Sequence, residues 1–150
     1  MTQKSLRIFL DTSVIVAAVL SLSGGARRQF LLAEAGILKP MVGPTVLRES
    51  DDVIRRKAPK LLPMLAQFLA IAQTETSHGA SRAHLKAARL YVTYVPDAHV
   101  LAEAIAADPD WFITLDKQHF LKTRQKIRLQ FEIGTPGDLI QKLKDDFKLL

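Results

Sequence analysis

Short, continuously apolar runs alternate with longer segments of mixed polarity along the chain. The runs have the length and the β-branched or aromatic content of strands. The segments between them begin with helix-capping residues or with proline, which favours the first turn of a helix. The predicted strands are residues 6–10, 37–42, 71–76, 111–115 and 131–133. The predicted helices are residues 14–20, 26–35, 44–57, 61–72, 82–90, 95–107 and 136–147.

This alternation predicts an α/β fold with a central, mostly parallel sheet of about four or five strands. Because the strands are apolar at consecutive positions, both faces of the sheet are expected to be covered by helices. Pro40 lies within the second strand and predicts that this strand is at a sheet edge or ends there. The 150 residues, 48% of them hydrophobic, are expected to form one domain over residues 1–150.

Composition excludes several classes of protein. The chain has no cysteine, which rules out disulfide scaffolds, thiol catalysis and cysteine-bound zinc. The longest apolar run, residues 14–20, is far shorter than the roughly 20 residues that span a bilayer. The N-terminus resembles a signal peptide, but Asp11 interrupts its apolar core, so we expect a cytoplasmic protein without a membrane partner. The net charge of +6 weakly favours a polyanionic partner.

Two acidic residues directly follow predicted strands. Asp11 comes after residues 6–10, and Asp116 comes after residues 111–115. In open parallel sheets ligands bind beyond the carboxyl ends of the strands, so both side chains are expected at one edge of the sheet. Asp97, at the start of the helix 95–107, lies on the side of that helix's apolar stripe and at the end nearest the same edge.

Glu49 is the fourth candidate acid. It is three residues after Val46 and four before Val53, which predicts a carboxylate on the inward face of its helix. A charge on that face needs a partner, and a metal ion would serve. Four converging carboxylates favour a hard ion, Mg²⁺ with Mn²⁺ as a substitute, and such a site supports phosphoryl transfer by a metal-activated water.

Each acid also has a purely structural interpretation. Asp11 and Asp97 have the positions of helix N-caps, Asp116 that of a turn aspartate, and Glu49 could reach solvent at the helix edge. These interpretations do not exclude metal binding. The functional interpretation gains weight because independent positions point to one edge of the sheet.

Three segments together resemble the motifs of PIN-domain nucleases. Residues 10–14 (LDTSV) resemble the family's opening motif, residues 97–105 (DAHVLAEAI) its central helix, and residues 111–120 (WFITLDKQHF) its closing strand. The resemblance extends from residue 6 to about residue 143. Ser13 stands where asparagine is also common in the family and Leu115 where glycine is common, and neither difference removes an acid.

The resemblance implies a three-layer α/β/α sandwich and Mg²⁺- or Mn²⁺-dependent endoribonuclease activity. Many compact members are toxins of toxin–antitoxin pairs, the VapC-like group, so it also implies RNA as substrate, a cognate antitoxin and a homodimer. Glu103 is a further nearby acid that could contribute without binding the metal. By position the metal ligands and catalytic residues would be Asp11, Glu49, Asp97 and Asp116, supported through hydrogen bonds by Thr12, Ser13 and Thr114.

Basic residues and histidines lie near these acids. The residues directly after Asp116 are basic and include no acid, so they could contact the phosphates of RNA. A solvent-exposed face without a ligand would have the same composition. His99 and His119 could act as proton shuttles, but structural or phosphate-binding roles are more common for such residues. The candidate RNA contacts are Lys117, Lys122, Arg124 and Lys126, with a second basic cluster at Arg55, Arg56, Lys57 and Lys60.

Two other functions stay open at this point. An aspartyl-nucleophile phosphatase would also place Asp11 after the first strand, but such enzymes usually carry a second acid two residues on, where this chain has Ser13. A non-catalytic RNA-binding or regulatory module would use the acids as caps. All four acids are present, which argues against a module that has lost its catalytic activity.

Overall fold

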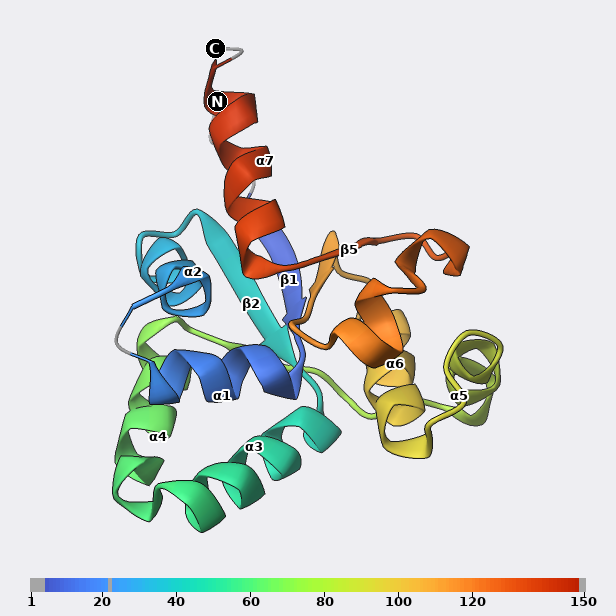
Figure 1. Ribbon diagram of the computed structural model, residues 1–150, viewed down its shortest axis with the longest axis horizontal. Helices are drawn as coiled ribbons and strands as arrows, with labels where there is room; N and C mark the ends of the chain where they lie inside the picture. The colour runs from blue at the N-terminus through green and yellow to red at the C-terminus, as the bar shows by residue number, and fades with distance from the viewer. Residues whose placement is uncertain (1–4, 22, 149–150) are drawn as a thin grey trace.

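A five-stranded sheet forms the centre of the computed structural model, which describes residues 5–21 and 23–148 (Figure 1). The strand order is β3-β2-β1-β4-β5, and every neighbouring pair is parallel. This confirms the predicted α/β fold with a parallel sheet. The strands are β1 (Leu6–Leu10), β2 (Leu38–Val42), β3 (Glu75–Thr76), β4 (Trp111–Ile113) and β5 (Glu132–Gly134).

Helices cover both faces of this sheet. Ile8, Phe9 and Leu10 are all at most 1% exposed, and consecutive strand residues point to opposite faces, so neither face of β1 meets solvent. The seven α-helices of the described residues are α1 (Thr12–Leu20), α2 (Gly25–Glu34), α3 (Pro44–Lys57), α4 (Leu62–Ile71), α5 (Arg82–Arg89), α6 (Val95–Ala107) and α7 (Pro136–Lys148). Three shorter turns are η1 (Pro59–Leu61), η2 (Lys117–Leu121, a π-helical turn) and η3 (Arg124–Lys126).

The prediction that Pro40 marks a sheet edge or a strand end is wrong, because β2 continues to Val42 and lies between β1 and β3. Pro40 pairs with Ile8 of β1. On the other side, β3 begins to pair only at Met41. Proline is tolerated at this internal position because no strand partner faces it on the β3 side.

Several predicted boundaries also shift. The strand predicted at 71–76 shortens to two residues, and the strand predicted at 111–115 ends at Ile113. Thr114 still donates its backbone N–H to Gly134 O, while Leu115 leaves the sheet and is 40% exposed. The apolar run in the sequence, residues 111–115, is therefore longer than the segment that pairs regularly in the sheet.

The end of β4 is anchored by aromatic packing. Phe112 stacks on Phe9 of β1, with ring centroids 6.0 Å apart, and contacts Phe120 of η2 at 4.9 Å. All three rings are fully buried. This packing ties η2, which follows Asp116, to the core of the sheet, so the side chains on η2 have a fixed position relative to β1 and β4.

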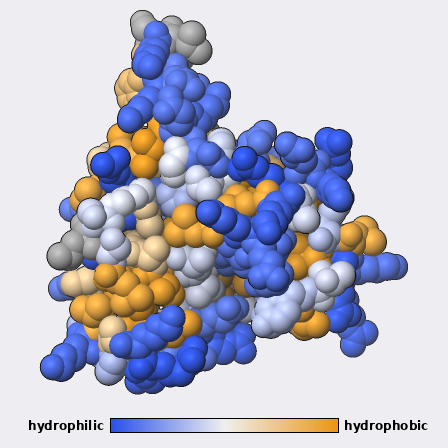
Figure 2. All heavy atoms as spheres, viewed as in Figure 1, coloured by the Kyte–Doolittle hydropathy of each residue, from blue (hydrophilic) through white to orange (hydrophobic). Residues whose placement is uncertain are grey.

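Apolar side chains reach the surface at several separate places. Figure 2 shows hydrophobic side chains on the lower left, over the region where Figure 1 shows α1. Leu20, at the end of α1, is 44% exposed. No single helix in the described ranges has the length and apolar character to cross a bilayer, and α1 and α2, bent by 93°, reach that threshold only as a pair.

Candidate functional site

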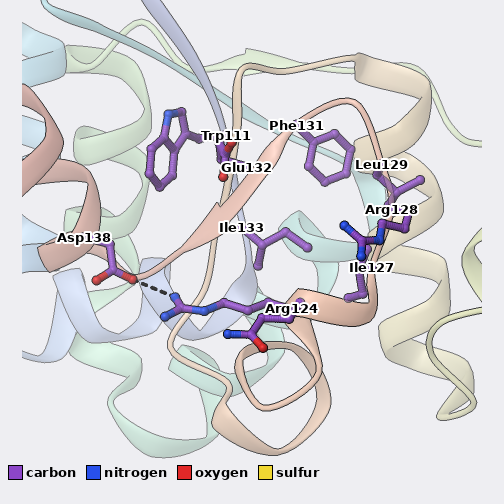
Figure 3. Close-up of a pocket in the computed structure, with 10 residues that line it drawn as sticks. Trp111, Arg124, Ile127, Arg128, Leu129, Phe131, Glu132, Ile133 and Asp138 are labelled. Carbon is purple, nitrogen blue, oxygen red and sulfur yellow. Dashed lines mark hydrogen bonds and ion pairs between the residues drawn. The ribbon is translucent and has the colours of Figure 1, made fainter.

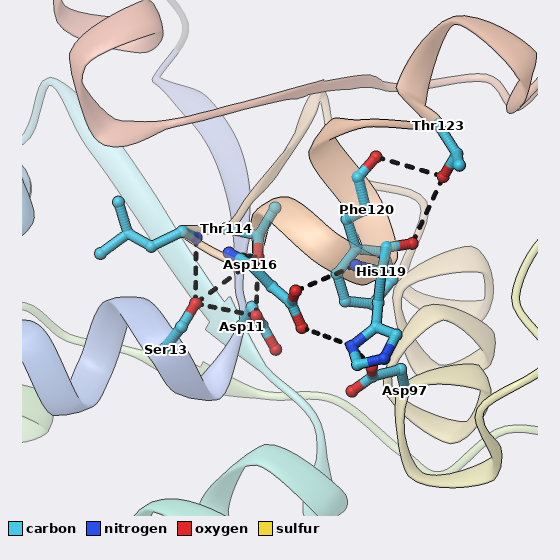
Figure 4. Close-up of polar contacts among 9 residues, drawn as sticks. Asp11, Ser13, Asp97, Thr114, Asp116, His119, Phe120 and Thr123 are labelled. Atoms are coloured by element: carbon cyan, nitrogen blue, oxygen red, sulfur yellow. Dashed lines mark hydrogen bonds and ion pairs between the residues drawn. The ribbon is translucent and has the colours of Figure 1, made fainter.

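Asp11 lies at the junction of β1 and α1, next to the end of β4 (Figure 4). Its backbone N–H donates to Ile113 O at 3.0 Å, which extends the pairing of the two strands. Asp11 is the N-cap residue of α1, as its position predicted, but its side chain makes no cap hydrogen bond, and the residue is only 5% exposed. Burial raises the pKa of Asp11, while hydrogen bonds from Thr114 and Ser13 act in the opposite direction.

Two hydroxyl groups hold this carboxylate and link it to the neighbouring strand. Thr114 Oγ1 and Ser13 Oγ donate to Asp11 Oδ2 at 2.7 and 2.9 Å. The same hydroxyls accept the backbone N–H groups of Asp116 and Leu115, each at 3.0 Å. Of the two hydroxyl residues that follow Asp11, Ser13 therefore contacts it. Thr12 Oγ1 is buried without a well-aligned hydrogen bond, but its hydroxyl lies close enough to Glu49 to lower the pKa of that carboxyl group.

Asp116 serves as the cap of η2 and also faces the site. Its Oδ1 accepts the backbone N–H of His119 at 3.0 Å, and its Oδ2 lies 3.0 Å from His119 Nδ1. Burial raises the pKa of Asp116, but the hydrogen bonds and charge of His119 outweigh burial and hold the pKa below its ordinary value. Asp116 is therefore the acid that stays ionised most readily.

Asp97 is the third residue of α6 and not its N-cap, a position that Tyr94 occupies. The interpretation of Asp97 as a helix cap is therefore wrong. Its Oδ2 is buried without a hydrogen bond, although His119 Nδ1 lies 2.7 Å away. Burial raises the pKa of Asp97 to about 6; the charge of His119 lowers it, and the charges of Asp116 and Asp11 raise it.

Glu49 is half-buried beside the inward face of α3, which consists of Val46, Ser50 and Ile54. Its Oε1 is buried without a hydrogen bond. Burial and the charges of Asp11 and Asp97 raise the pKa of Glu49 to about 7. Glu49 on α3 is therefore electrostatically coupled to Asp11 after β1 and to Asp97 on α6.

Glu103 holds the start of α3 in place. Its carboxylate is 5% exposed and accepts the Thr45 hydroxyl at 2.7 Å and the Thr45 backbone N–H at 3.1 Å. Gly43 makes this approach possible, because an added Cβ would collide with the Glu103 carboxyl group. Glu103 thus links α6, which carries Asp97, to α3, which carries Glu49.

The donor groups fit a divalent cation. Asp97, Asp116 and His119 each offer a ligand atom, and these atoms lie within 4.8 Å of one another. Two carboxylate oxygens, Glu49 Oε1 and Asp97 Oδ2, are buried without a hydrogen bond. Carboxylate oxygens are the preferred ligands of Mg²⁺ and Mn²⁺. A cation would favour the charged forms of Glu49 and Asp97, whose pKa values are raised first by burial and then by neighbouring carboxylates.

The candidate RNA contacts lie on the exposed segment after Asp116. Lys117, Lys122 and Lys126 are exposed. Arg124 is also exposed, but its guanidinium is paired with Asp138 at 2.9 Å. The sequence did not reveal this pair, which occupies the side chain predicted to contact phosphate.

A cavity of about 480 Å³ beside β5 lies outside the acidic cluster (Figure 3). Its lining includes Trp111, Phe131 and the Arg124–Asp138 pair. None of the four acids lines it. The chemistry indicated by the carboxylates is therefore located in the cluster at the ends of β1 and β4.

The comparisons with known proteins agree with this fold. A family model described as "PIN domain" matches residues 7–118, while no curated protein matches the chain in sequence. VapBC2 from Rickettsia felis, bound to a DNA fragment from its promoter, is 15% identical, with a TM-score of 0.62 over 87% of this chain and 98% of that one. DNA-bound VapBC from Salmonella typhimurium is 14% identical, with a TM-score of 0.63 over the same shares.

A third solved structure is Mycobacterium tuberculosis VapC20, described as a toxin that cleaves the sarcin–ricin loop. It is 17% identical, with a TM-score of 0.55 over 74% of this chain and 91% of that one. Identities at this level establish a shared fold. Because the family model covers most of the sequence, and the sheet and helices follow the arrangement expected from the motifs, the chain belongs to the PIN domain family.

Proposed function

We propose that this protein is an endoribonuclease that cleaves RNA phosphodiester bonds with a divalent cation, Mg²⁺ or Mn²⁺. The observation that carries the proposal is the cluster of Asp97, Asp116 and His119, whose ligand atoms lie within 4.8 Å of one another. Asp11 is bonded to the same end of β4 through Thr114, and the charges of Asp11 and Asp97 act on Glu49. Membership of the PIN domain family supports it. The proposed catalytic and metal-binding residues are Asp11, Glu49, Asp97 and Asp116.

The chain's own residues prepare this site. Ser13 and Thr114 orient Asp11 and tie it to the end of β4. Glu103 fixes the start of α3 and so the position of Glu49. A bound divalent ion would lower the pKa of a water molecule that it holds and would neutralise negative charge on the phosphate.

RNA would approach along the basic segment after Asp116. The ammonium groups of Lys117, Lys122 and Lys126 are exposed and would neutralise phosphates on either side of the scissile bond. Arg124 contributes less, because Asp138 already holds its guanidinium. We expect these contacts to position RNA without specifying its sequence.

The proposal extends to a toxin of a toxin–antitoxin pair. Two structures with the same fold are VapBC complexes, and a third is the toxin VapC20. We propose a cognate antitoxin as partner, a homodimer as the working form, a single nuclease domain over residues 1–150, and a cytoplasmic location. Growth arrest on expression, relieved by a small protein encoded next to this chain, is the expected result.

The phosphatase alternative loses support from the contacts of Ser13. An aspartyl-nucleophile phosphatase would need Asp11 as nucleophile and a second acid at position 13. This chain has Ser13 there, and its hydroxyl donates to Asp11 Oδ2. No contact in the described residues favours that chemistry over hydrolysis of RNA. An RNA cleavage experiment distinguishes the non-catalytic alternative from the proposed nuclease.

Cleavage of a mixed RNA pool tests the proposal. The wild type with Mn²⁺ is expected to cleave RNA and leave 5′-phosphate and 3′-hydroxyl ends, while EDTA and Asp97→Asn each abolish cleavage. Asp108→Asn is the matched control, because Asp108 ends the same helix in the left-handed conformation that asparagine tolerates. Cleavage that survives Asp97→Asn, or that leaves 2′,3′-cyclic phosphates, would contradict the proposal.

A further inference from the structure

The imidazole of His119 lies between two of the carboxylates. Its Nδ1 is 2.7 Å from Asp97 Oδ2 and 3.0 Å from Asp116 Oδ2 (Figure 4). One ring nitrogen therefore contacts oxygens that come from α6 and from the end of β4. The contact with Asp116 is a hydrogen bond, and the contact with Asp97 is an ion pair when the ring is protonated.

Three features hold this ring in place. Tyr94 stacks on it with centroids 4.9 Å apart and planes 9° from parallel. The backbone N–H of His119 donates to Asp116 Oδ1, and the next residue, Phe120, is fully buried against Phe112. π-Helical turns such as η2 are frequent at functional sites. The ring is thus positioned before any ligand arrives.

The distances match those between neighbouring ligands of one ion. Adjacent ligands of an octahedral ion, each about 2.1 Å from the metal, lie about 3.0 Å apart. The two contacts of Nδ1, at 2.7 and 3.0 Å, are of this size. Asp97 Oδ2 is buried, and its one polar contact among the described residues is His119 Nδ1, so an ion bound beside His119 would lie within reach of this oxygen.

We propose that His119 Nδ1 is a ligand of the divalent ion, beside Asp97 and Asp116, and that it makes the site prefer Mn²⁺ to Mg²⁺. Both ions favour carboxylate oxygens, but Mn²⁺ belongs to the transition-metal series whose ions also bind nitrogen ligands, whereas Mg²⁺ is bound through oxygen. Without the ion Nδ1 is hydrogen-bonded to Asp116, so the ion would replace the Nδ1 proton, which leaves to solvent, and the neutral ring would keep its proton on Nε2. Tyr94 is then a positioning residue that acts through the ring. The inference rests on the proposed function, which supplies the ion.

Calorimetric titration of the full-length chain with Mn²⁺ and with Mg²⁺ tests the selectivity. We expect His119→Asn to weaken Mn²⁺ binding at least about tenfold and Mg²⁺ binding less than about threefold. His78→Asn is the matched control, since His78 is exposed and remote from the acids in sequence. Equal losses for both ions, or unchanged or tighter Mn²⁺ binding by His119→Asn, would overturn the proposal.

Electron spin echo spectroscopy of bound Mn²⁺ tests ligation without relying on activity or on a variant that folds. The wild type is expected to show coupling to a coordinated ¹⁴N nucleus, which His78→Asn keeps and His119→Asn loses. Bound Mn²⁺ without nitrogen coupling in the wild type would overturn the inference and leave the proposed function intact. Nitrogen coupling in a protein that cleaves no RNA would support His119 as a ligand and contradict the proposed function.

Discussion

The two sides of the acidic cluster differ in how much of their polar surface the protein itself satisfies. On one side, Asp11 receives two hydroxyl hydrogen bonds, and the same hydroxyls accept two backbone N–H groups. On the other side, Glu49 and Asp97 each keep a buried oxygen without a hydrogen bond. The pKa values of Glu49 and Asp97 rise to about 7 and about 6.

This difference indicates a division of roles. Folding alone fixes the Asp11 side, because its hydrogen bonds join β1 to the end of β4. The side formed by Glu49 and Asp97 has carboxylates whose charges the protein offsets only in part, through His119 and Thr12, so a cation or a proton would stabilise it further. Damage to the Asp11 side should therefore appear as lost stability, and damage to the other side as altered cation binding.

The largest effect on stability is expected from Thr114→Val. Thr114 is fully buried, and its hydroxyl both donates to Asp11 and accepts the Asp116 N–H. Losing these bonds should lower the free energy of unfolding by about 2–3 kcal/mol. Urea denaturation measures this, and the exposed Thr93→Val should stay within about 0.5 kcal/mol of the wild type. A Thr114→Val variant that is as stable as the wild type would contradict the distinction between the two sides of the acidic cluster.

Gly43→Ala tests the link that positions Glu49. The new methyl group would displace the Glu103 carboxylate from the start of α3, at a cost of about 1–3 kcal/mol. Because α3 carries Glu49, the variant should also bind Mn²⁺ more weakly. Gly79→Ala is the control, since nothing lies within 4 Å of its added Cβ. Unchanged Mn²⁺ binding by a destabilised Gly43→Ala would mean that Glu103 supports the fold without positioning Glu49.

The pH dependence of stability should reveal the unsatisfied side. The folded pKa values of Glu49 and Asp97, about 7 and about 6, exceed their ordinary values of 4.5 and 3.8. The unfolded chain therefore loses these protons at lower pH, so raising the pH through this window favours unfolding. His119, whose pKa is raised by its hydrogen bond to Asp116, acts in the same direction.

Thermal melts in EDTA should accordingly show a melting temperature that falls between about pH 5 and about pH 8, on the order of 5 °C. Added Mn²⁺ should restore most of this loss at the higher pH. Glu49→Gln should flatten the profile, whereas Glu34→Gln, an exposed position on α2, should not. A rising profile in EDTA would contradict the assigned pKa directions.

The smallest effects are expected on the basic segment. Lys122→Ala should weaken RNA binding less than tenfold and reduce the salt dependence of log affinity by about 0.7–0.9, as for one lost phosphate contact. Arg124→Ala should change the salt dependence less, because Asp138 already holds its guanidinium. Filter binding at several salt concentrations compares them. A larger change for Arg124→Ala would show that RNA displaces Asp138.

The sequence predicted those parts of the site that follow local rules. Asp11 comes directly after β1 and Asp116 three residues after β4, and the carboxyl ends of neighbouring parallel strands must meet at one edge. The alternation of strands and helices predicted the architecture in the same way. Pro40 was misjudged because its tolerance depends on where the short β3 begins, which no local pattern around Pro40 shows.

The remaining contacts join residues far apart in the sequence. Glu103 caps α3 through Thr45, 58 residues away, and Tyr94 stacks on His119. One signal was available, because Glu103 is an acid within the apolar run of α6, and such a position calls for a buried partner. The partner itself depends on how α3 packs against α6, which no spacing in the sequence reports.

Anomalous diffraction from a crystal grown with Mn²⁺ would locate the cation on which the proposed function depends. We predict an anomalous peak bounded by the carboxylates of Asp97 and Asp116, at the carboxyl ends of β1 and β4. A well-ordered site without such a peak in excess Mn²⁺, or a peak only at exposed acids such as Asp51 and Asp52, would contradict the assignment of these carboxylates as the metal site.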